Sequence, residues 1–220
     1  MTKPTYFSAE ARAEPFGFVC SRCSHCCHDK LIQMNPYEIA RLAANQGVSA
    51  AEFRARFTQD GAGLYLAQKE EGACVFLGPQ GCTVHRDRPL VCRLYPLGRQ
   101  ITESGSERFV HVTPHPLSGG SFNKQGTIAD FLAAQKVDDF IRAADDYFTW
   151  FCKARDAMAE AGGGDPGLTA DANELLDMDL AIAAHCLRTG EEAPSDMEAR
   201  RRLHMVILDQ AIEALEGSKP

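Results

Sequence analysis

The stretch Cys20-Ser21-Arg22-Cys23-Ser24-His25-Cys26-Cys27 places four cysteines within eight residues. A Cys-x2-Cys spacing lets two sulfur atoms turn back toward one centre, with backbone amides free to donate to them. The first three of these cysteines also have the spacing of the first three ligands in a bacterial ferredoxin. We therefore take this knuckle (residues 20–30) as the element that organises the fold, around bound metal.

The adjacent pair Cys26 and Cys27 carries further information. Side chains of neighbouring residues diverge in extended or helical backbone. We therefore expect one sulfur of the pair to serve one metal centre, and the other to serve a second centre or to bridge. Three more cysteines, Cys74, Cys82 and Cys92, come from separate turns. We expect these to tie small strands to the knuckle and to replace missing hydrophobic core.

The total of nine cysteines is odd, so a closed set of disulfides would leave one unpaired. Residues 1–12 are polar and lack the apolar run of a signal peptide. We expect a cytoplasmic, reducing location, where structural disulfides are rare. Buried free thiols are a poor explanation for seven cysteines with ligand spacing. Cys152 and Cys186 stand alone in helical patterns, so we expect them to be small core residues.

The composition of the 220-residue chain is that of a globular protein, with 45% apolar and 24% charged residues. A net charge of −7 argues against a general nucleic-acid binder, and no apolar run is long enough to span a membrane. Residues 1–124 hold 14 basic and 11 acidic side chains, whereas residues 125–220 hold 9 and 19. The spare positive charge lies in the cysteine-rich half, although ordinary surface variation gives similar asymmetry. Arg200-Arg201-Arg202 is expected to be a solvated helix face.

Seven thiolates leave two four-ligand metal sites one ligand short. His115 is the leading candidate for the eighth ligand, because it lies in a loop made rigid by two flanking prolines. Four other histidines compete with it: His25, His28, His85 and His111. A lone histidine is more often a surface residue or a satisfied core residue than a ligand.

Capping signals predict several helices. The predicted helices are one starting at Asn35-Pro36 and stopping at Gly47, a short one opened by Ser49, a turn after Pro89 that carries Cys92, a long one from Thr127 to Phe151, and two over 171–189 and 195–216. A Gly-rich break is expected at 162–167.

The strand signals are weaker and short. Strands are expected at 64–67, 74–77 and 82–85, a hairpin at 100–112, a loop at 114–126 and an arm at 1–19. The predicted fold class is therefore mainly α with small β elements, in which a metal-stapled, irregular N-terminal half packs on a C-terminal helical segment. We place the cysteine-cluster region at 17–135 and the helical segment at 136–220, as one structural unit.

The knuckle, Cys74-Val75-Phe76-Leu77, and the run from Cys82 through Arg88-Pro89 to Cys92-Arg93 and Tyr95-Pro96 together resemble the YkgJ-like cysteine-cluster family. Proteins of that family are described as zinc- or iron-chelating, and sometimes as iron–sulfur proteins. The resemblance covers roughly residues 17–135. It departs from the family at His85, where an aromatic residue is usual. Some distant relatives look like flagellin lysine methylases, which implies methyl transfer.

The family usually has another cysteine in a Cys-Pro-Gly loop, where this chain has His115-Pro116-Leu117-Ser118-Gly119-Gly120. The resemblance therefore implies that His115 takes the place of that cysteine. The implied metal ligands are Cys20, Cys23, Cys26, Cys27, Cys74, Cys82, Cys92 and His115.

Three interpretations of the metal site and its role compete. Soft thiolates exclude magnesium and calcium but do not separate zinc from iron–sulfur. The ferredoxin-like triplet favours an iron–sulfur cluster or iron, which we prefer, whereas the histidine and the dispersed ligands favour closed, structural zinc sites in an interaction module.

The third interpretation is a metal-dependent oxidoreductase or methyltransferase, and whether the chain is an enzyme stays open. It lacks the G-x-G-x-x-G, P-loop and H-E-x-x-H signatures. Arg88 and Arg93 are candidates to bind an anion, although such arginines more often neutralise thiolate charge or brace the fold. Metal ions are the expected partners, and a protein partner is left open.

Overall fold

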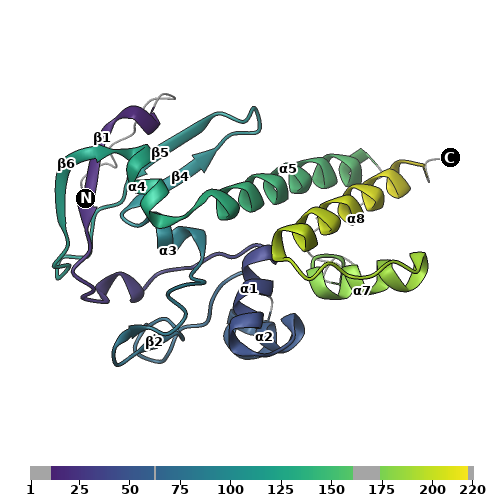
Figure 1. Ribbon diagram of the computed structural model, residues 1–220, viewed down its shortest axis with the longest axis horizontal. Helices are drawn as coiled ribbons and strands as arrows, with labels where there is room; N and C mark the ends of the chain where they lie inside the picture. Colours follow the sequence, from purple (N-terminus) through teal and green to yellow (C-terminus); the bar gives the residue numbers. More distant parts are fainter. Residues whose placement is uncertain (1–10, 62, 161–173, 218–220) are drawn as a thin grey trace. The chain divides into compact units, whose positions relative to one another are not determined.

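The computed structural model describes residues 11–61, 63–160 and 174–217. About half of the chain is helical, and the strands form three small antiparallel sheets (Figure 1). The predicted class, mainly α with small β elements, is confirmed. The α-helices are α1 (Pro36–Gln46), α2 (Ala50–Phe57), α3 (Leu90–Leu94), α4 (Ile128–Gln135), α5 (Asp138–Glu160), α7 (Met178–Thr189) and α8 (Met197–Gly217). None of the helices in these ranges is long and apolar enough to cross a membrane.

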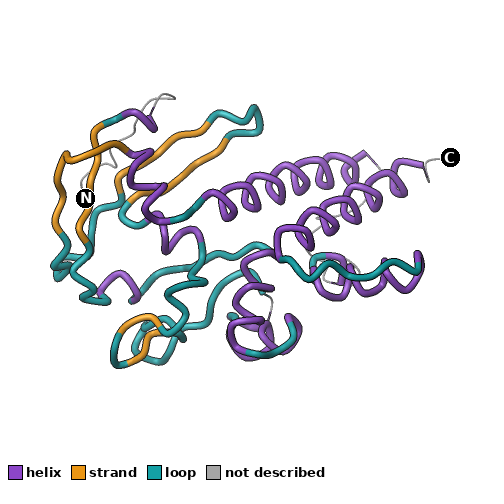
Figure 2. Tube along the Cα trace, in the orientation of Figure 1, coloured by secondary structure: helices purple, strands orange, loops and turns teal. Residues whose placement is uncertain are grey.

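The strands, drawn as orange segments in Figure 2, are short, and those of the described residues lie between positions 15 and 127. They are β1 (Pro15–Val19), β2 (Leu77–Gly78), β3 (Gly81–Cys82), β4 (Leu97–Ile101), β5 (Glu107–His111) and β6 (Ser121–Thr127). Three 3-10 turns accompany them: η1 (Ala11–Ala13), η2 (His25–Cys27) and η3 (Gln59–Gly61).

The chain forms two compact units. The cysteine unit combines Met1–Met34 with Ala55–Ile141, and the helical unit combines Asn35–Arg54 with Arg142–Pro220. Helix α1 therefore belongs with the C-terminal helices, although it directly follows the knuckle in sequence. The boundary near residue 136 stays a prediction.

The sheets of the cysteine unit pair β1 with β6, β2 with β3 and β4 with β5. The expected loop at 114–126 is wrong in its second half, because Ser121–Thr127 forms a strand against β1. Its partner lies about a hundred residues earlier, and Phe122 packs edge-on against Phe16 at a centroid distance of 6.3 Å. The predicted turn between β2 and β3 is present. The strands expected at 74–77 and 82–85 are wrong over most of their length, because the ladder holds only Leu77–Gly78 and Gly81–Cys82.

The strand expected at 64–67 is also wrong, because these residues form only isolated bridges. Tyr65 bridges to Gln33 and Leu66 to Thr58. The expected hairpin is present, and it pairs Leu97 with His111 and Ile101 with Glu107.

The long helix predicted from Thr127 is interrupted. Thr127 and Asp130 form the expected capping box, but the helix ends after Gln135 because Lys136 adopts a left-handed conformation with φ of 53°. Val137 is fully buried at the corner, and α5 starts at Asp138. The expected break at 162–167 and the first residues of the helix predicted at 171–189 lie outside the described residues.

The helical unit has its own apolar core. Its buried members are Ala40, Met178, Ala181, Ile182 and Ile207. Cys186 packs against this core, as expected of a small apolar residue. Helix α1 has the predicted ends: Asn35 and Glu38 form a capping box, and Gly47 stops the helix in a left-handed conformation.

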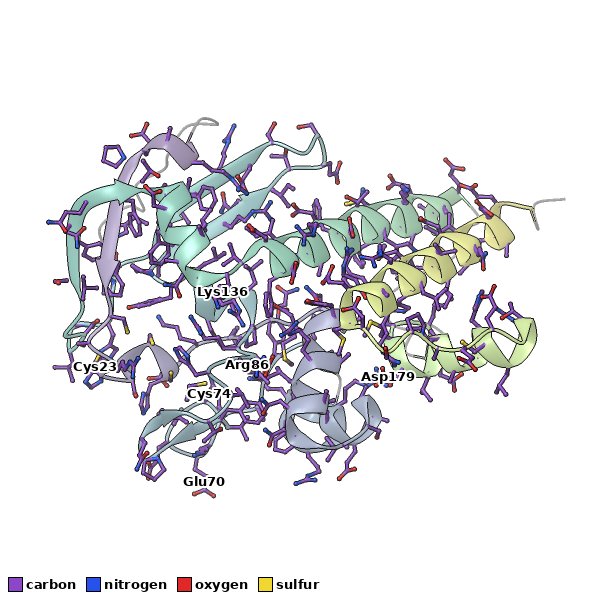
Figure 3. The ribbon with its side chains drawn as sticks, viewed as in Figure 1. Cys23, Glu70, Cys74, Arg86, Lys136 and Asp179 are labelled. Carbon is purple, nitrogen blue, oxygen red and sulfur yellow. The ribbon has the colours of Figure 1, made fainter. Side chains whose placement is uncertain are left out.

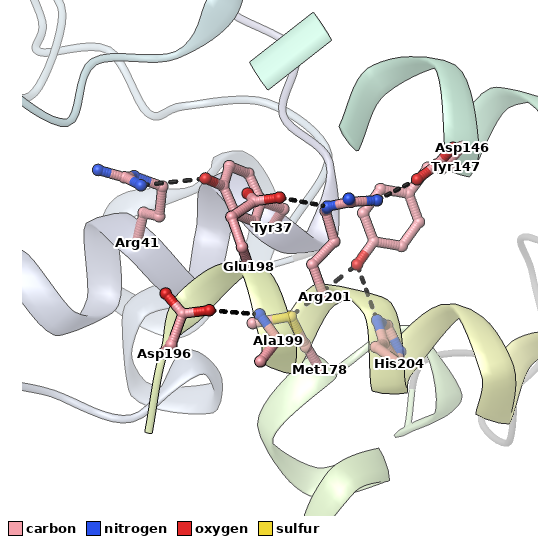
Figure 4. Close-up of polar contacts among 10 residues, drawn as sticks. All are labelled: Tyr37, Arg41, Asp146, Tyr147, Met178, Asp196, Glu198, Ala199, Arg201 and His204. Atoms are coloured by element: carbon pink, nitrogen blue, oxygen red, sulfur yellow. Dashed lines mark hydrogen bonds and ion pairs between the residues drawn. The ribbon is translucent and has the colours of Figure 1, made fainter. Parts of the chain in front are cut away.

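A polar network also lies inside the helical unit (Figure 4). Arg201 is only 5% exposed and pairs with Glu198 and Asp146, so the expectation of a solvated basic face is wrong for this residue. Beside it, the hydroxyl of Tyr147 lies 2.8 Å from Nδ1 of His204. The basic run therefore contributes one buried arginine with two ion pairs, rather than only a surface.

Candidate metal centre

The knuckle is a tight turn built on left-handed backbone. Arg22 and Ser24 have φ of 55° and 63°, and the 3-10 turn η2 follows directly. Its first hydrogen bond runs from the amide of Cys27 to the carbonyl of Ser24, at 2.9 Å.

This turn brings the sulfur atoms of Cys26 and Cys27 to 3.9 Å from each other. The expected divergence of the two side chains is therefore wrong, because it assumed extended or regular helical backbone. Two thiolates at about 2.3 Å from one tetrahedral metal ion are about 3.8 Å apart. The separation in the structure suits two ligands of a shared ion as well as a bridge between two ions.

Cys74 joins the knuckle through the backbone. Its amide donates to the carbonyl of Cys27 at 2.7 Å, and His28 forms an antiparallel bridge with Ala73. The close approach requires glycine at position 72, because its φ is 76° and a Cβ there would lie 2.2 Å from the carboxylate of Asp29. The sequence expectation that Cys74 ties to the knuckle thus has a backbone basis.

Cys82 and Cys92 come from the next two elements. Cys82 ends β3 and pairs with Leu77, whose amide donates to the carbonyl of Cys74 at 2.9 Å. Cys92 lies in the single-turn helix α3, as the sequence predicts from Pro89. Figure 3 shows sulfur atoms in yellow between the labelled Cys23 and Cys74.

The thiol groups influence one another's protonation. The hydrogen bond between Cys26 and Cys27 lowers the pKa of Cys26 to about 6 and raises that of Cys27. Burial raises the Cys27 pKa further, and so do the charges of Cys92 and Cys82. Burial also raises the pKa of Cys74, with a smaller contribution from Cys82. Thiols from the knuckle, β3 and α3 therefore lie within electrostatic range of each other.

Cys23 has a different environment. Its pKa is lowered to about 7, first by a hydrogen bond from the amide of His25, then by the hydroxyl of Ser21 and the amide of Gly119. Ser118 adds a weaker hydrogen bond. The loop that follows His115 therefore closes over the knuckle and donates to a cysteine sulfur.

These donors were not predicted from the sequence. The available signal was the small, polar run Ser118-Gly119-Gly120. A Cβ at Gly119 would lie 2.8 Å from the hydroxyl oxygen of Ser21, so a larger residue would push the loop away from the knuckle.

His115 reaches the same region by stacking. Its ring lies parallel to that of His25, with centroids 5.2 Å apart, and its amide donates to the hydroxyl of Tyr95 at 3.2 Å. Its Nδ1 accepts a hydrogen bond from the amide of Leu117 at 3.1 Å, which places the proton of the neutral ring on Nε2. Ligation through either ring nitrogen requires that this hydrogen bond break, because Nδ1 is already accepting and Nε2 carries the ring proton. The ligand role of His115 therefore stays a prediction.

The competing histidines are spread over the cysteine unit. Nδ1 of His28 and Nε2 of His111 are buried atoms that have no hydrogen-bond partner among the described residues. His85 is exposed, and its Nδ1 lies 3.2 Å from the guanidinium of Arg88.

All nine cysteines are free thiols. As the side chains are placed, no group of three or more Cys, His, Asp or Glu residues in the described ranges lies close enough to hold a metal ion. The donor set is nevertheless the soft one that zinc, iron and iron–sulfur clusters take. The residues present fit such a group in their chemistry.

One comparison with known proteins gave a match. The family model described as "CxxCxxCC: Putative zinc- or iron-chelating domain" matches residues 19–113. Residues 19–113 are therefore similar to this family, and we use the term CxxCxxCC domain below for this segment. No curated protein and no solved structure matches the chain. The match contains all seven clustered cysteines and ends just before His115, so the resemblance expected from the motifs is confirmed over this segment.

Proposed function

We propose that the seven clustered cysteines of the CxxCxxCC domain, together with His115 just beyond it, hold an iron–sulfur cluster or iron. The coarser assignment, a zinc- or iron-chelating domain, comes from the family match. The choice of iron is supported by the ferredoxin-like spacing of Cys20, Cys23 and Cys26.

The observation that carries the proposal is the approach of Cys26 and Cys27 to 3.9 Å, with Cys74 hydrogen-bonded to the backbone of the same pair. In the metal-free state this arrangement crowds thiols that repel once they ionise. A bound cation offsets that repulsion, since thiolate ligands are deprotonated when they coordinate.

The chain's own residues would hold and orient the group. The knuckle, Cys74, β3 and α3 would supply thiolates, while Ser118 and Gly119 donate hydrogen bonds to the sulfur of Cys23. Hydrogen bonds to coordinated sulfur stabilise its negative charge and influence the redox potential of a cluster. When bound, the metal group supplies the electron-transfer or structural chemistry.

A structural zinc site is the second candidate, and the size of the β elements favours it. β2 and β3 have two residues each, too few to bury an apolar face of their own. Small irregular elements of this kind are commonly held by closed tetrahedral zinc.

Metal analysis of the full chain, purified without oxygen or chelator, separates these candidates. We expect a brown protein with visible absorption, iron and acid-labile sulfide. A colourless protein with stoichiometric zinc would refute the iron assignment and support the second candidate. A protein that holds neither metal, and that takes up neither on reconstitution, would refute metal binding altogether.

A matched pair of variants tests whether the clustered cysteines hold the metal. Cys27→Ser removes one thiolate of the close pair and should lower the metal content at least several-fold, because a missing ligand leaves the coordination shell open. Cys186→Ser removes a thiol in the helical unit, packed against the core there, and should leave the metal content unchanged. Equal metal content in the two variants would contradict the assignment of Cys27.

A further inference from the structure

Arg88 occupies a defined place between two of the clustered cysteines. It lies on the segment that joins Cys82 in β3 to Cys92 in α3. Its Nη1 donates to the carbonyl of His85 at 2.6 Å, and its Nη2 donates to Oε1 of Gln135 at 2.7 Å. The guanidinium is therefore held from two sides, by its own turn and by the end of α4.

Several of the clustered cysteines lie within electrostatic range of Arg88. Burial lowers the pKa of its guanidinium, and the thiolate charges of four cysteines oppose this effect. These four are Cys92, Cys82, Cys20 and Cys26. They come from the knuckle, β3 and α3, so the positive charge of Arg88 acts on all three parts of the cluster.

Arg93 has a different role, although it lies only five residues further on. Its guanidinium donates to the backbone carbonyls of Arg88, Gln135 and Arg86, and it lies 3.9 Å from the ring centroid of Phe140. It is 5% exposed and braces the fold. The two arginines that the sequence left equivalent are therefore distinguished by what they contact.

We propose that Arg88 is a built-in counter-charge of the metal centre, and that it raises the affinity of the cysteines for their metal without being a ligand. The inference rests on the proposed function. Four thiolates around a divalent ion leave a net charge of about −2, which a fixed guanidinium nearby stabilises. Changes to groups just outside a coordination shell typically alter metal affinity about 10- to 100-fold.

The test measures zinc affinity of the full chain by competition with a chromophoric chelator, under anaerobic reducing conditions. Arg88→Gln should weaken zinc binding about 10- to 100-fold, and Arg88→Lys should recover most of the loss because it keeps the charge. Arg86→Gln is the matched control: this neighbouring arginine is exposed, and the substitution should leave the affinity unchanged. The gap between wild type and Arg88→Gln should narrow at high salt.

A purely structural role predicts a different pattern. Lysine lacks the fork that reaches both His85 and Gln135, so Arg88→Lys would then lose as much affinity as Arg88→Gln. That result would overturn the proposal, as would an Arg88→Gln affinity within threefold of wild type. If Arg88→Gln fails to fold, the affinity of Arg88→Lys alone decides between the two roles. Failure of the wild-type protein to bind zinc, iron or a cluster would instead refute the proposed function.

Discussion

His204 is fully buried in the helical unit and has a contact at each ring nitrogen. Nδ1 lies 2.8 Å from the hydroxyl of Tyr147, and Nε2 lies 2.8 Å from the carbonyl of Leu175. Burial lowers the pKa of His204 to about 4, because the charged imidazolium is poorly solvated there. The folded protein therefore keeps this histidine neutral in an interior that carries several other polar groups.

The pKa shift of His204 makes stability depend on pH. The unfolded chain binds the proton near pH 6.5 and the folded chain only near pH 4. The contribution of neutral His204 to the free energy of unfolding is therefore fully present above about pH 6.5 and is lost as the pH falls toward 4. Between pH 7 and pH 5 the loss is about 2 kcal/mol. Urea unfolding at both pH values measures it. His204→Gln should reduce the difference between the two pH values, and an unchanged difference would contradict the prediction.

At the scale of the element, α1 tests how far local sequence determines structure. The side chain of Asn35 accepts from the amide of Glu38 at 3.0 Å, and Glu38 accepts from the amide of Asn35 at 3.0 Å. Asn35→Ala leaves orphan amide donors at the first turn, so we expect a loss of about 1 kcal/mol of unfolding free energy. Chemical denaturation measures the loss. Asn45→Ala, near the other end of the same helix, controls for general effects of substitution. An equal loss of unfolding free energy in this variant would contradict the capping role of Asn35.

Elements defined by neighbouring residues were predictable, and elements defined by distant partners were not. The caps of α1 and α4 and the turn between β2 and β3 follow from residues within a few positions. Strand β6 depends on β1, about a hundred residues away, and its Ser- and Gly-containing sequence resembles a loop. The break between α4 and α5 depends on a left-handed lysine, which no local propensity favours.

The same distinction applies to the candidate site. The cysteine spacing predicted the clustered region, because ligand type and interval are local properties of the sequence. The separation of Cys26 and Cys27 was mispredicted, since it depends on left-handed backbone at Arg22 and Ser24, both of which carry side chains. Ser118 and Gly119 reach Cys23 only through tertiary contact, about 95 residues along the chain.

At the scale of the whole molecule, the two units differ in what holds them together. The helical unit has a core of side chains from α1, α7 and α8, and ion pairs around the buried Arg201. The CxxCxxCC domain has two-residue strands and single bridges around its cysteines. If metal supplies the missing cohesion there, its removal should affect the two units unequally.

Hydrogen exchange before and after chelation under reducing conditions measures this difference. We expect amides at 20–30 and 72–92 to lose most of their protection, because their backbone ladders are only one or two residue pairs long. Amides in α7 and α8 should keep theirs, since the apolar core of these helices includes no clustered cysteine. Metal-loaded protein carried through the same buffer without chelator is the control. Unchanged protection at 20–30 would show that the knuckle is stable without metal, and loss throughout α7 and α8 would show that the helical unit also depends on it.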